Sequence, residues 1–148
     1  MSWNKEDLIP SQEITDKVTN VTVEFASRFG AYLGKDEKKN IVDRNGRTKE
    51  IKEAKLTTNQ LRKFFGEVKR QQMSGYDVTD FVLLKPKLAY AVGRAKDENA
   101  KINDFYWVIS RAIDEVHNEH QFSNFIKIFE AIVAYHKAAE ESKLNDNE

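Results

Sequence analysis

The chain has 148 residues, with 24 basic and 24 acidic side chains, a formal net charge of zero and no cysteine. This length suits one domain with a real core, and the missing cysteine excludes disulfides and thiolate metal sites and fits a reducing compartment. No segment approaches the roughly 20 apolar residues of a membrane helix, and the polar N-terminus shows no secretory signal. We therefore expect a cytoplasmic protein.

The N-terminal third is predicted to be one long helix followed by a linker. Apolar residues recur at helical spacing from Ile14 to Tyr32, and Ser11 is a suitable N-cap. A strand around Val18–Val23 is the less favoured alternative, because the segment is rich in β-branched residues. Gly34–Thr48 is polar, carries the turn signal Asn45-Gly46 and is predicted to be a mobile linker that loosens the packing of the first helix.

The chain after Leu56 is predicted to form five helices. Thr57 and Gln60 match a capping box, which begins a helix whose apolar stripe is Leu61, Phe64, Phe65 and Val68. Asp77 or Thr79 is expected to cap the next helix. Pro86 either kinks this helix or begins a new one. Two further amphipathic stretches run from Ile102 to Val116 and from Phe122 to His136, and the polar tail after Lys143 is expected to fray.

Together these elements predict an all-α fold, a compact bundle of about five helices with a long N-terminal helix joined by a polar linker. In domain terms we expect a single all-helical domain over residues 1–148. Its parts are an N-terminal helix (1–33), a flexible linker (34–48) and a helical bundle (49–142).

The neutral total hides a strongly uneven distribution of charge. Between Arg44 and Lys96 there are 13 basic and 5 acidic residues, a net charge of +8, while residues 1–43 carry −2 and residues 97–148 carry −6. A cationic middle attracts polyanions such as nucleic acid, whereas acidic ends repel them and suit basic partners.

Two predicted helices carry the most suggestive basic positions. On the helix after Thr57, Arg62 and Lys69 share one flank, and Lys63 and Arg70 lie opposite the apolar stripe. On the later helix, Lys87, Tyr90 and Arg94 form one stripe, in which cations suit phosphates and a tyrosine ring suits a base. The alternative for the helix after Thr57 is an ordinary solvated surface without a binding role. For Tyr90, the apolar residues around it in the sequence favour a ring packed in the protein interior.

The sequence offers little that resembles an active site. His117 and His120 lie three residues apart, but no third ligand follows at a known metal spacing, and the chain has no Gly-rich phosphate loop. Surface histidines at a helix end explain the pair better, and His136 lies on the apolar face of the last helix. We therefore predict a protein that is not an enzyme and holds no metal or other cofactor. A metal hydrolase that uses His117 and His120 is the weakest of the hypotheses considered.

Three stretches carry a family resemblance: Leu56–Phe65, Leu84–Arg94 and Phe125–Lys137. In order and separation they resemble the small subunit of type III-A CRISPR–Cas interference complexes, the Csm complexes of prokaryotic antiviral defence, over roughly residues 52–140. The last two stretches are the more specific. Gly93, within a predicted helix, is a mild departure that would allow close packing.

The resemblance implies a small non-catalytic subunit, several copies of which line up opposite the backbone subunits and contact the guide–target RNA without reading its sequence. The expected partners are the guide (crRNA) and target RNA, the other subunits and further copies of the chain, with a homodimer in isolation. The residues predicted to contact RNA are Lys55, Arg62, Lys63, Lys69, Arg70, Lys87, Arg94 and Lys137. The alternative is a helical adaptor or oligomerisation protein whose basic strip binds an acidic protein.

Overall fold

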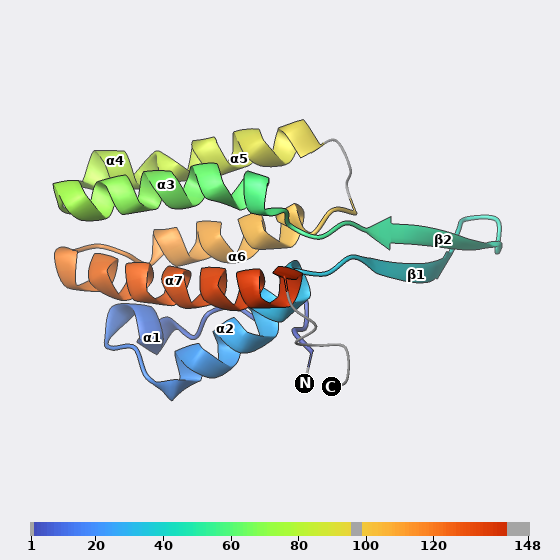
Figure 1. Ribbon diagram of the computed structural model, residues 1–148, viewed down its shortest axis with the longest axis horizontal. Coiled ribbons are helices and arrows are strands. Elements are labelled where there is room, and N and C mark those ends of the chain that lie inside the picture. Colours follow the sequence, from blue (N-terminus) through green and yellow to red (C-terminus); the bar gives the residue numbers. More distant parts are fainter. Residues whose placement is uncertain (1, 96–98, 142–148) are drawn as a thin grey trace.

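A computed structural model describes residues 2–95 and 99–141, which form seven helices and two strands. The helices lie in three layers (Figure 1). One outer layer holds α3 (Thr58–Ser74), α4 (Val78–Val82) and α5 (Leu84–Ala95). The middle layer holds α6 (Ile102–Asp114) and α7 (Glu119–Glu141), and the other outer layer holds α1 (Ser11–Thr15) and α2 (Asn20–Leu33). None of the described helices is long and apolar enough to cross a membrane.

The predicted long N-terminal helix is wrong, because the chain breaks between α1 and α2. The Glu13 carboxylate accepts hydrogen bonds from the backbone N–H and hydroxyl of both Thr19 and Thr22, at 2.7 to 3.0 Å. The Thr19 hydroxyl in turn caps α2 by accepting from the Val21 N–H. Burial raises the pKa of Glu13, but the hydrogen bonds from Thr22 and Thr19 outweigh it and hold the pKa below its usual value. Ser11 is the first residue of α1 rather than its N-cap.

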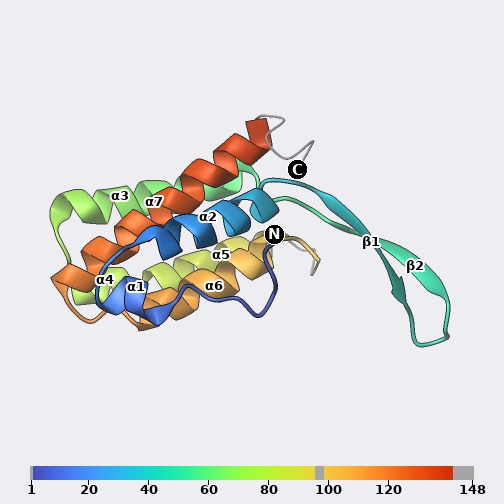
Figure 2. The same ribbon diagram turned by 90° about the horizontal axis from the view of Figure 1, so that it is seen from below.

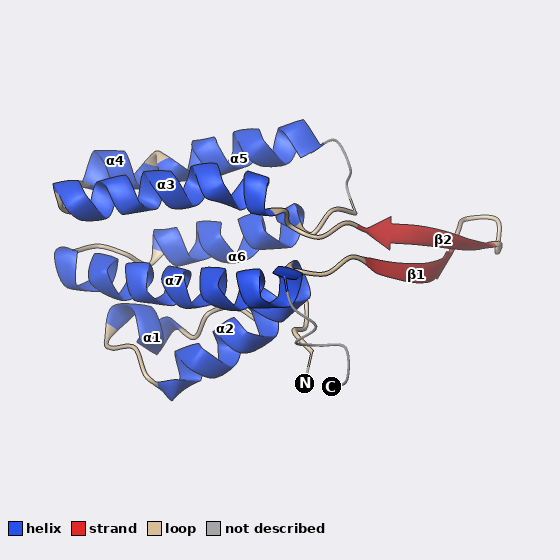
Figure 3. Ribbon diagram, viewed as in Figure 1, coloured by secondary structure: helices blue, strands red, loops and turns tan. Residues whose placement is uncertain are grey.

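The predicted mobile linker is also wrong, because its residues form most of an antiparallel hairpin (Figure 3). Strand β1 (Glu37–Val42) pairs with β2 (Thr48–Glu53) in a register that runs from Glu37 opposite Glu53 to Val42 opposite Thr48. The turn predicted at Asn45-Gly46 is confirmed: Gly46 has φ of 77°, and the Asp43 carboxylate accepts from the Asn45 and Arg47 N–H groups at 2.9 Å each. The broad all-α assignment stands, with this small sheet as an unpredicted addition.

The five helices predicted after Leu56 are confirmed. Thr57 and Gln60 form the capping box of α3, and the Asp77 carboxylate caps α4. Pro86 lies in the first turn of a new helix, α5, where its missing N–H costs nothing. The predicted tail after Lys143, and the predicted end of the bundle at residue 142, lie outside the described residues.

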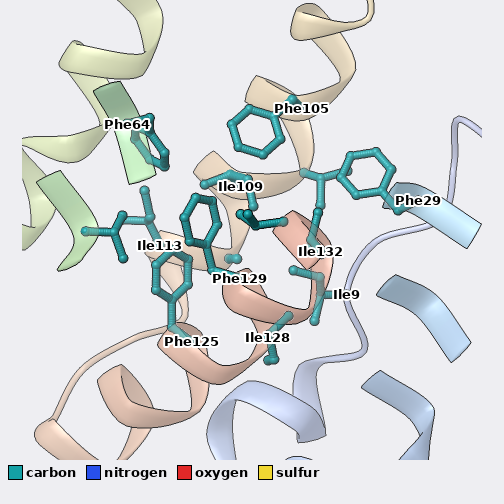
Figure 4. Close-up of a cluster of buried hydrophobic side chains, with 14 of the residues drawn as sticks. Ile9, Phe29, Phe64, Phe105, Ile109, Ile113, Phe125, Ile128, Phe129 and Ile132 are labelled. Atoms are coloured by element: carbon teal, nitrogen blue, oxygen red, sulfur yellow. The ribbon is translucent and has the colours of Figure 1, made fainter. Parts of the chain in front are cut away.

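Aromatic side chains on α7 fill the space between the layers (Figure 4). Phe129 is fully buried, stacks on Phe125 at a centroid distance of 6.0 Å and forms a T-shaped pair with Phe64 at 5.5 Å. The predicted stripe of α7, from Phe122 to His136, is buried throughout. The core therefore joins α3, α6 and α7 in one cluster. Because the apolar side of α3 packs into this core, the other side of the helix faces solvent.

The predicted loose packing of the first helix is wrong, because α2 lies very close to α7. A β-carbon built on Gly30 would be 2.6 Å from the Tyr135 β-carbon and 2.8 Å from the His136 backbone nitrogen. Such distances leave no room for a side chain, so glycine is required here for packing rather than for backbone freedom. Phe25, Phe29 and Leu33 of α2 are buried in the same contact.

Candidate nucleic-acid interface

The candidate site is built on the solvent side of α3. Leu61, Phe64 and Val68 face the core, so residues between them point outward in two pairs. Arg62 and Lys69 lie toward α7, and Lys63 and Arg70 lie toward α4 and α5. The two predicted rows of cations are present, but the second row reaches toward α4 and α5 instead of standing directly opposite the apolar stripe.

The row that faces α7 gathers around one aromatic ring. The Nζ atoms of Lys69 and Lys137 lie 5.7 and 5.8 Å from the centroid of the Phe65 ring. Lys69 also pairs with Glu130 at 2.5 Å. Arg62 lines a shallow hollow with Phe65 and Lys137. Three cations from two helices thus converge on a single patch.

The row that faces α5 borders a groove of about 570 Å³ between α3 and α5. We call it the α3–α5 groove. Its apolar floor includes Phe64, Ala91 and Ala95, and its polar rim is formed by Asn59, Gln60, Lys63, Glu67, Lys87, Tyr90 and Arg94. The Tyr90 side chain is 69% exposed, and the Arg94 guanidinium lies 5.8 Å from its ring centroid. The predicted packing of the Tyr90 ring is therefore wrong.

One carboxylate, Glu67, holds two of the predicted cations. It accepts from the Arg70 guanidinium at 2.6 Å and from the Lys87 ammonium at 3.0 Å, the latter across the groove. The Arg70 hydrogen bond is the largest influence on Glu67, and with Gln71 and Lys87 it lowers the pKa of the carboxyl to about 2. Glu67 therefore stays ionised and partly neutralises this side of α3.

The eight predicted residues differ in how firmly they are already paired. Lys55, Lys69, Arg70 and Lys87 each form an ion pair with a carboxylate, that of Lys55 being Glu140 at 3.6 Å. Among the residues that the structure describes, Arg62, Lys63, Arg94 and Lys137 make no such pair. Exposed ion pairs contribute at most about 1 kcal/mol, so a phosphate can displace the carboxylate of the first four.

The histidine pair shows no sign of a metal site. The His120 Nε2 atom lies 2.6 Å from the Asp16 carbonyl oxygen. Across residues 2–95 and 99–141, no group of three or more His, Asp or Glu side chains is arranged to hold a metal ion. His136 is buried, with its Nε2 atom against the Leu56 carbonyl oxygen at 2.5 Å.

Sequence reasoning missed the cations of the hairpin as part of an ordered surface. The predicted linker includes Lys38, Arg44 and Arg47 and ends just before Lys49, whereas all four cations lie on or beside paired strands. The turn signal was present, but lysines on both faces obscured the alternation that marks a strand.

Fold and surface together define a small, mostly helical protein with cationic rows on one outer helix. The family profile described as Csm2 Type III-A matches residues 19–142, so the chain belongs to this family. Csm2 is a structural small-subunit family, which makes the protein a subunit of the type III-A CRISPR–Cas defence complex, the Csm complex. The comparisons gave no match to a curated protein or to a solved structure.

Proposed function

We propose that the protein is a non-catalytic subunit that contacts guide–target RNA through the solvent side of α3 and the neighbouring faces of α5 and α7. The observation that carries the proposal is the cluster of cations on both sides of α3, with Arg62 and Lys63 unpaired within the described part of the chain. Base pairing between guide and target already supplies the sequence information. The protein therefore needs to bind only backbone charge and shape.

The α3–α5 groove gives this surface a second kind of contact. Tyr90 and Arg94 offer a ring and a planar guanidinium beside Lys63, and stacking on either is tolerant of base identity. Contacts of this kind favour RNA of any sequence. The complete set of proposed RNA-contacting residues remains Lys55, Arg62, Lys63, Lys69, Arg70, Lys87, Arg94 and Lys137.

The direct test is charge reversal at the two unpaired positions, Arg62→Glu with Lys63→Glu. We expect affinity for mixed-sequence RNA to fall at least tenfold at low salt. The log–log salt slope should become less negative by about 0.7 for each phosphate that the variant no longer binds. Fluorescence polarisation with labelled RNA measures both. An unchanged affinity would remove α3 from the RNA interface.

A matched control lies in the opposite layer. Lys17 is exposed in the connection between α1 and α2. The middle layer lies between this connection and α3 (Figure 1). Reversal of this single charge, Lys17→Glu, should change affinity much less than Arg62→Glu alone. Equal losses would mean that net charge, rather than a defined surface, governs binding.

A mirror test uses the residue that neutralises the groove. Glu67→Gln removes the carboxylate that holds Arg70 and Lys87, so both cations become available to phosphates. We expect RNA affinity to rise by about two- to fivefold at low salt, an increase that added salt abolishes. A decrease would mean that Glu67 positions these side chains for binding rather than competing with RNA.

The isolated protein offers few phosphate contacts, so we expect micromolar RNA affinity without sequence preference. Outside the complex, exposed apolar side chains such as Val78, Val82 and Leu83 favour self-association, and we expect homodimers by light scattering. Backbone and other Csm subunits are the proposed protein partners.

A further inference from the structure

The hairpin projects from one end of the helical bundle, as two perpendicular views show (Figures 1 and 2). We call residues 38–52 the hairpin arm. The arm contains six basic residues and two acidic ones, a net charge of +4 in a protein whose total is zero. A two-stranded ribbon is marginally stable by itself, so an ordered one must be anchored to the rest of the protein. Its exposed positive charge also calls for a functional explanation.

The anchor is a compact ionic cluster at the base of the hairpin. Glu37 and Glu53 lie directly opposite each other, where like charges would repel. The fully buried Lys101 ammonium donates hydrogen bonds to the Glu37 carboxylate at 2.5 Å and to the Tyr32 carbonyl at 2.7 Å. The Lys39 ammonium forms an ion pair with Glu53 at 3.0 Å.

Backbone bonds tie the same base to the bundle. The Leu56 N–H donates to the Leu33 carbonyl at 2.8 Å, and the Lys101 N–H donates to the Ala54 carbonyl at 2.9 Å. These bonds join the segment that follows β2 to the end of α2 and to the start of α6. The base therefore holds the direction of the arm relative to α3.

Most of the charge on the arm is not neutralised by the protein itself. Lys39 pairs with Glu53 and Lys52 with Asp36, and Asp43 is occupied by the backbone of the turn. That leaves Lys38, Arg44, Arg47 and Lys49 without an ion pair among the residues described. A surface that keeps four cations unpaired is suited to an anionic partner.

The arrangement of side chains on the ribbon favours nucleic acid over protein. On one face, Lys49 lies opposite Ile41 and Lys39 lies opposite Ile51. Val42, the next residue after Ile41, is on the other face, so the exposed apolar residues Ile41 and Val42 are separated. They do not form the continuous apolar patch that a protein partner would bury. Cations on both faces and in the turn instead suit a ribbon that lies along or between rows of phosphates.

We propose that the hairpin arm is a second RNA-binding element, which contacts the ribose–phosphate backbone and extends the basic surface of α3 beyond the bundle. The inference rests on the proposed function, because it takes RNA as the ligand of α3. Each strand has six residues and spans about 20 Å, which is nearly as long as α3 at about 25 Å. The arm thus nearly doubles the length of RNA that one copy can contact.

The test compares three variants of the full chain. The arm variant carries Lys38→Gln, Arg44→Gln, Arg47→Gln and Lys49→Gln; the helix variant carries Arg62→Gln and Lys63→Gln; the control variant carries Ile41→Thr and Val42→Thr. Circular dichroism verifies that each variant is folded. The arm substitutions should leave the fold unchanged, because the four cations they replace are exposed and form no ion pair with the residues that the structure describes. Binding is measured by fluorescence polarisation at several salt concentrations, with a long mixed-sequence RNA, alone and annealed to its complement, and with a short RNA that spans only α3.

For the long single strand, the arm variant should lose at least tenfold in affinity, and its salt slope should become less negative by up to about 3, or 0.7 for each of four phosphates. The short RNA should bind the arm variant and the unaltered protein equally well. The control variant should bind both like the unaltered protein. A larger loss with the annealed RNA than with the single strand would identify a duplex groove as the site of the arm, and the reverse would identify one strand.

The outcomes separate the two proposals. If the helix variant loses affinity and the arm variant does not, the arm is not an RNA contact and the proposed function stands. If the arm variant alone loses affinity, the α3 surface fails and the arm remains. Loss of affinity in both variants would support both proposals, and loss in neither would overturn both. If only the control variant changes, through weaker self-association, the arm docks on protein and the inference is wrong.

A measurement on the unaltered protein provides an independent check. Bound RNA should protect Lys38 and Lys49 from an amine-reactive label, while Lys17 in the opposite layer should react as before. Equal labelling of Lys38 and Lys49 with and without saturating long RNA would contradict the inference, whatever the variants show.

Discussion

Two pairs of neighbouring helices in this protein show opposite packing. Helix α2 lies so close to α7 that Gly30 has no room for a β-carbon, and Gly34 meets the His136 carbonyl oxygen in the same way. Helix α5 stands apart from α3, buries only Leu84 and Leu88, and leaves the α3–α5 groove between them.

The difference shows where stability and binding are separated in the fold. The α2–α7 contact removes apolar surface from water and depends on close fit, so it tolerates little change. Helices α3 and α5 instead face each other across the α3–α5 groove, which the Lys87–Glu67 ion pair bridges. The polar residues on the rim of the groove can therefore serve a ligand without weakening the core.

The largest expected effect is at the close contact. Gly30→Ala would place a β-carbon 2.8 to 2.9 Å from backbone atoms of His136 and Ile132, which cannot move aside as a flexible side chain would. We expect the free energy of unfolding to fall by about 2 to 3 kcal/mol in urea denaturation. An unchanged value would mean that α2 is free to shift away from α7.

An intermediate effect is expected at the carboxylate of the open contact. Glu67 has a pKa of about 2 in the folded protein and an ordinary value of 4.5. A lowered pKa stabilises the fold above about pH 4.5, and this contribution is lost as the pH falls toward about 2. After solvent screening, Glu67→Gln should cost about 1 kcal/mol at neutral pH.

The pH dependence gives the sharper measurement. Between about pH 5 and pH 2, Glu67→Gln should lose less stability than the unaltered protein, because the titrating group is gone. Parallel curves of unfolding free energy against pH would show that Glu67 is not the responsible carboxyl.

The smallest effect, with the opposite sign, is expected at Gly93 on α5. A β-carbon there would meet nothing within 4 Å, so the predicted role of Gly93 in close packing is wrong. Gly93→Ala should stabilise the protein by up to about 1 kcal/mol, through helix propensity alone. A loss of stability in thermal unfolding would place α5 closer to its neighbours than the groove allows.

Local rules predicted the helical layers well because each signal lies within a few residues. The capping box of Thr57 and Gln60 and the cap at Asp77 satisfy backbone groups from nearby in the chain. The break before α2 depends on Glu13, whose buried carboxylate reaches Thr19 and Thr22. A glutamate at a helix start looks the same in sequence whether it faces water or folds inward.

The hairpin was missed for a longer-range reason. Its base depends on Lys101, which is distant in sequence from Glu37 and Glu53, and nothing local marks a lysine as fully buried. The division of the α3 cations into two rows was predictable, because the apolar stripe fixes their direction, but the reach of the second row toward α4 and α5 was not. The pairing of Lys69 was not predictable, since its partner Glu130 comes from another helix, α7.

The burial of Trp3 has a practical consequence for any shortened version of the protein. Its ring lies 4.7 Å from that of Phe29 and 4.9 Å from that of Tyr32, and Ile9 and Ile14 are buried with it. Trp3, Ile9 and Ile14 all precede residue 19, where the family match begins. A polypeptide trimmed to that match would expose the Phe29 and Tyr32 rings to water and aggregate more readily. In a full-length Trp107→Phe variant, which keeps Trp3 as the single tryptophan, the emission wavelength would report whether the first residues are packed against α2.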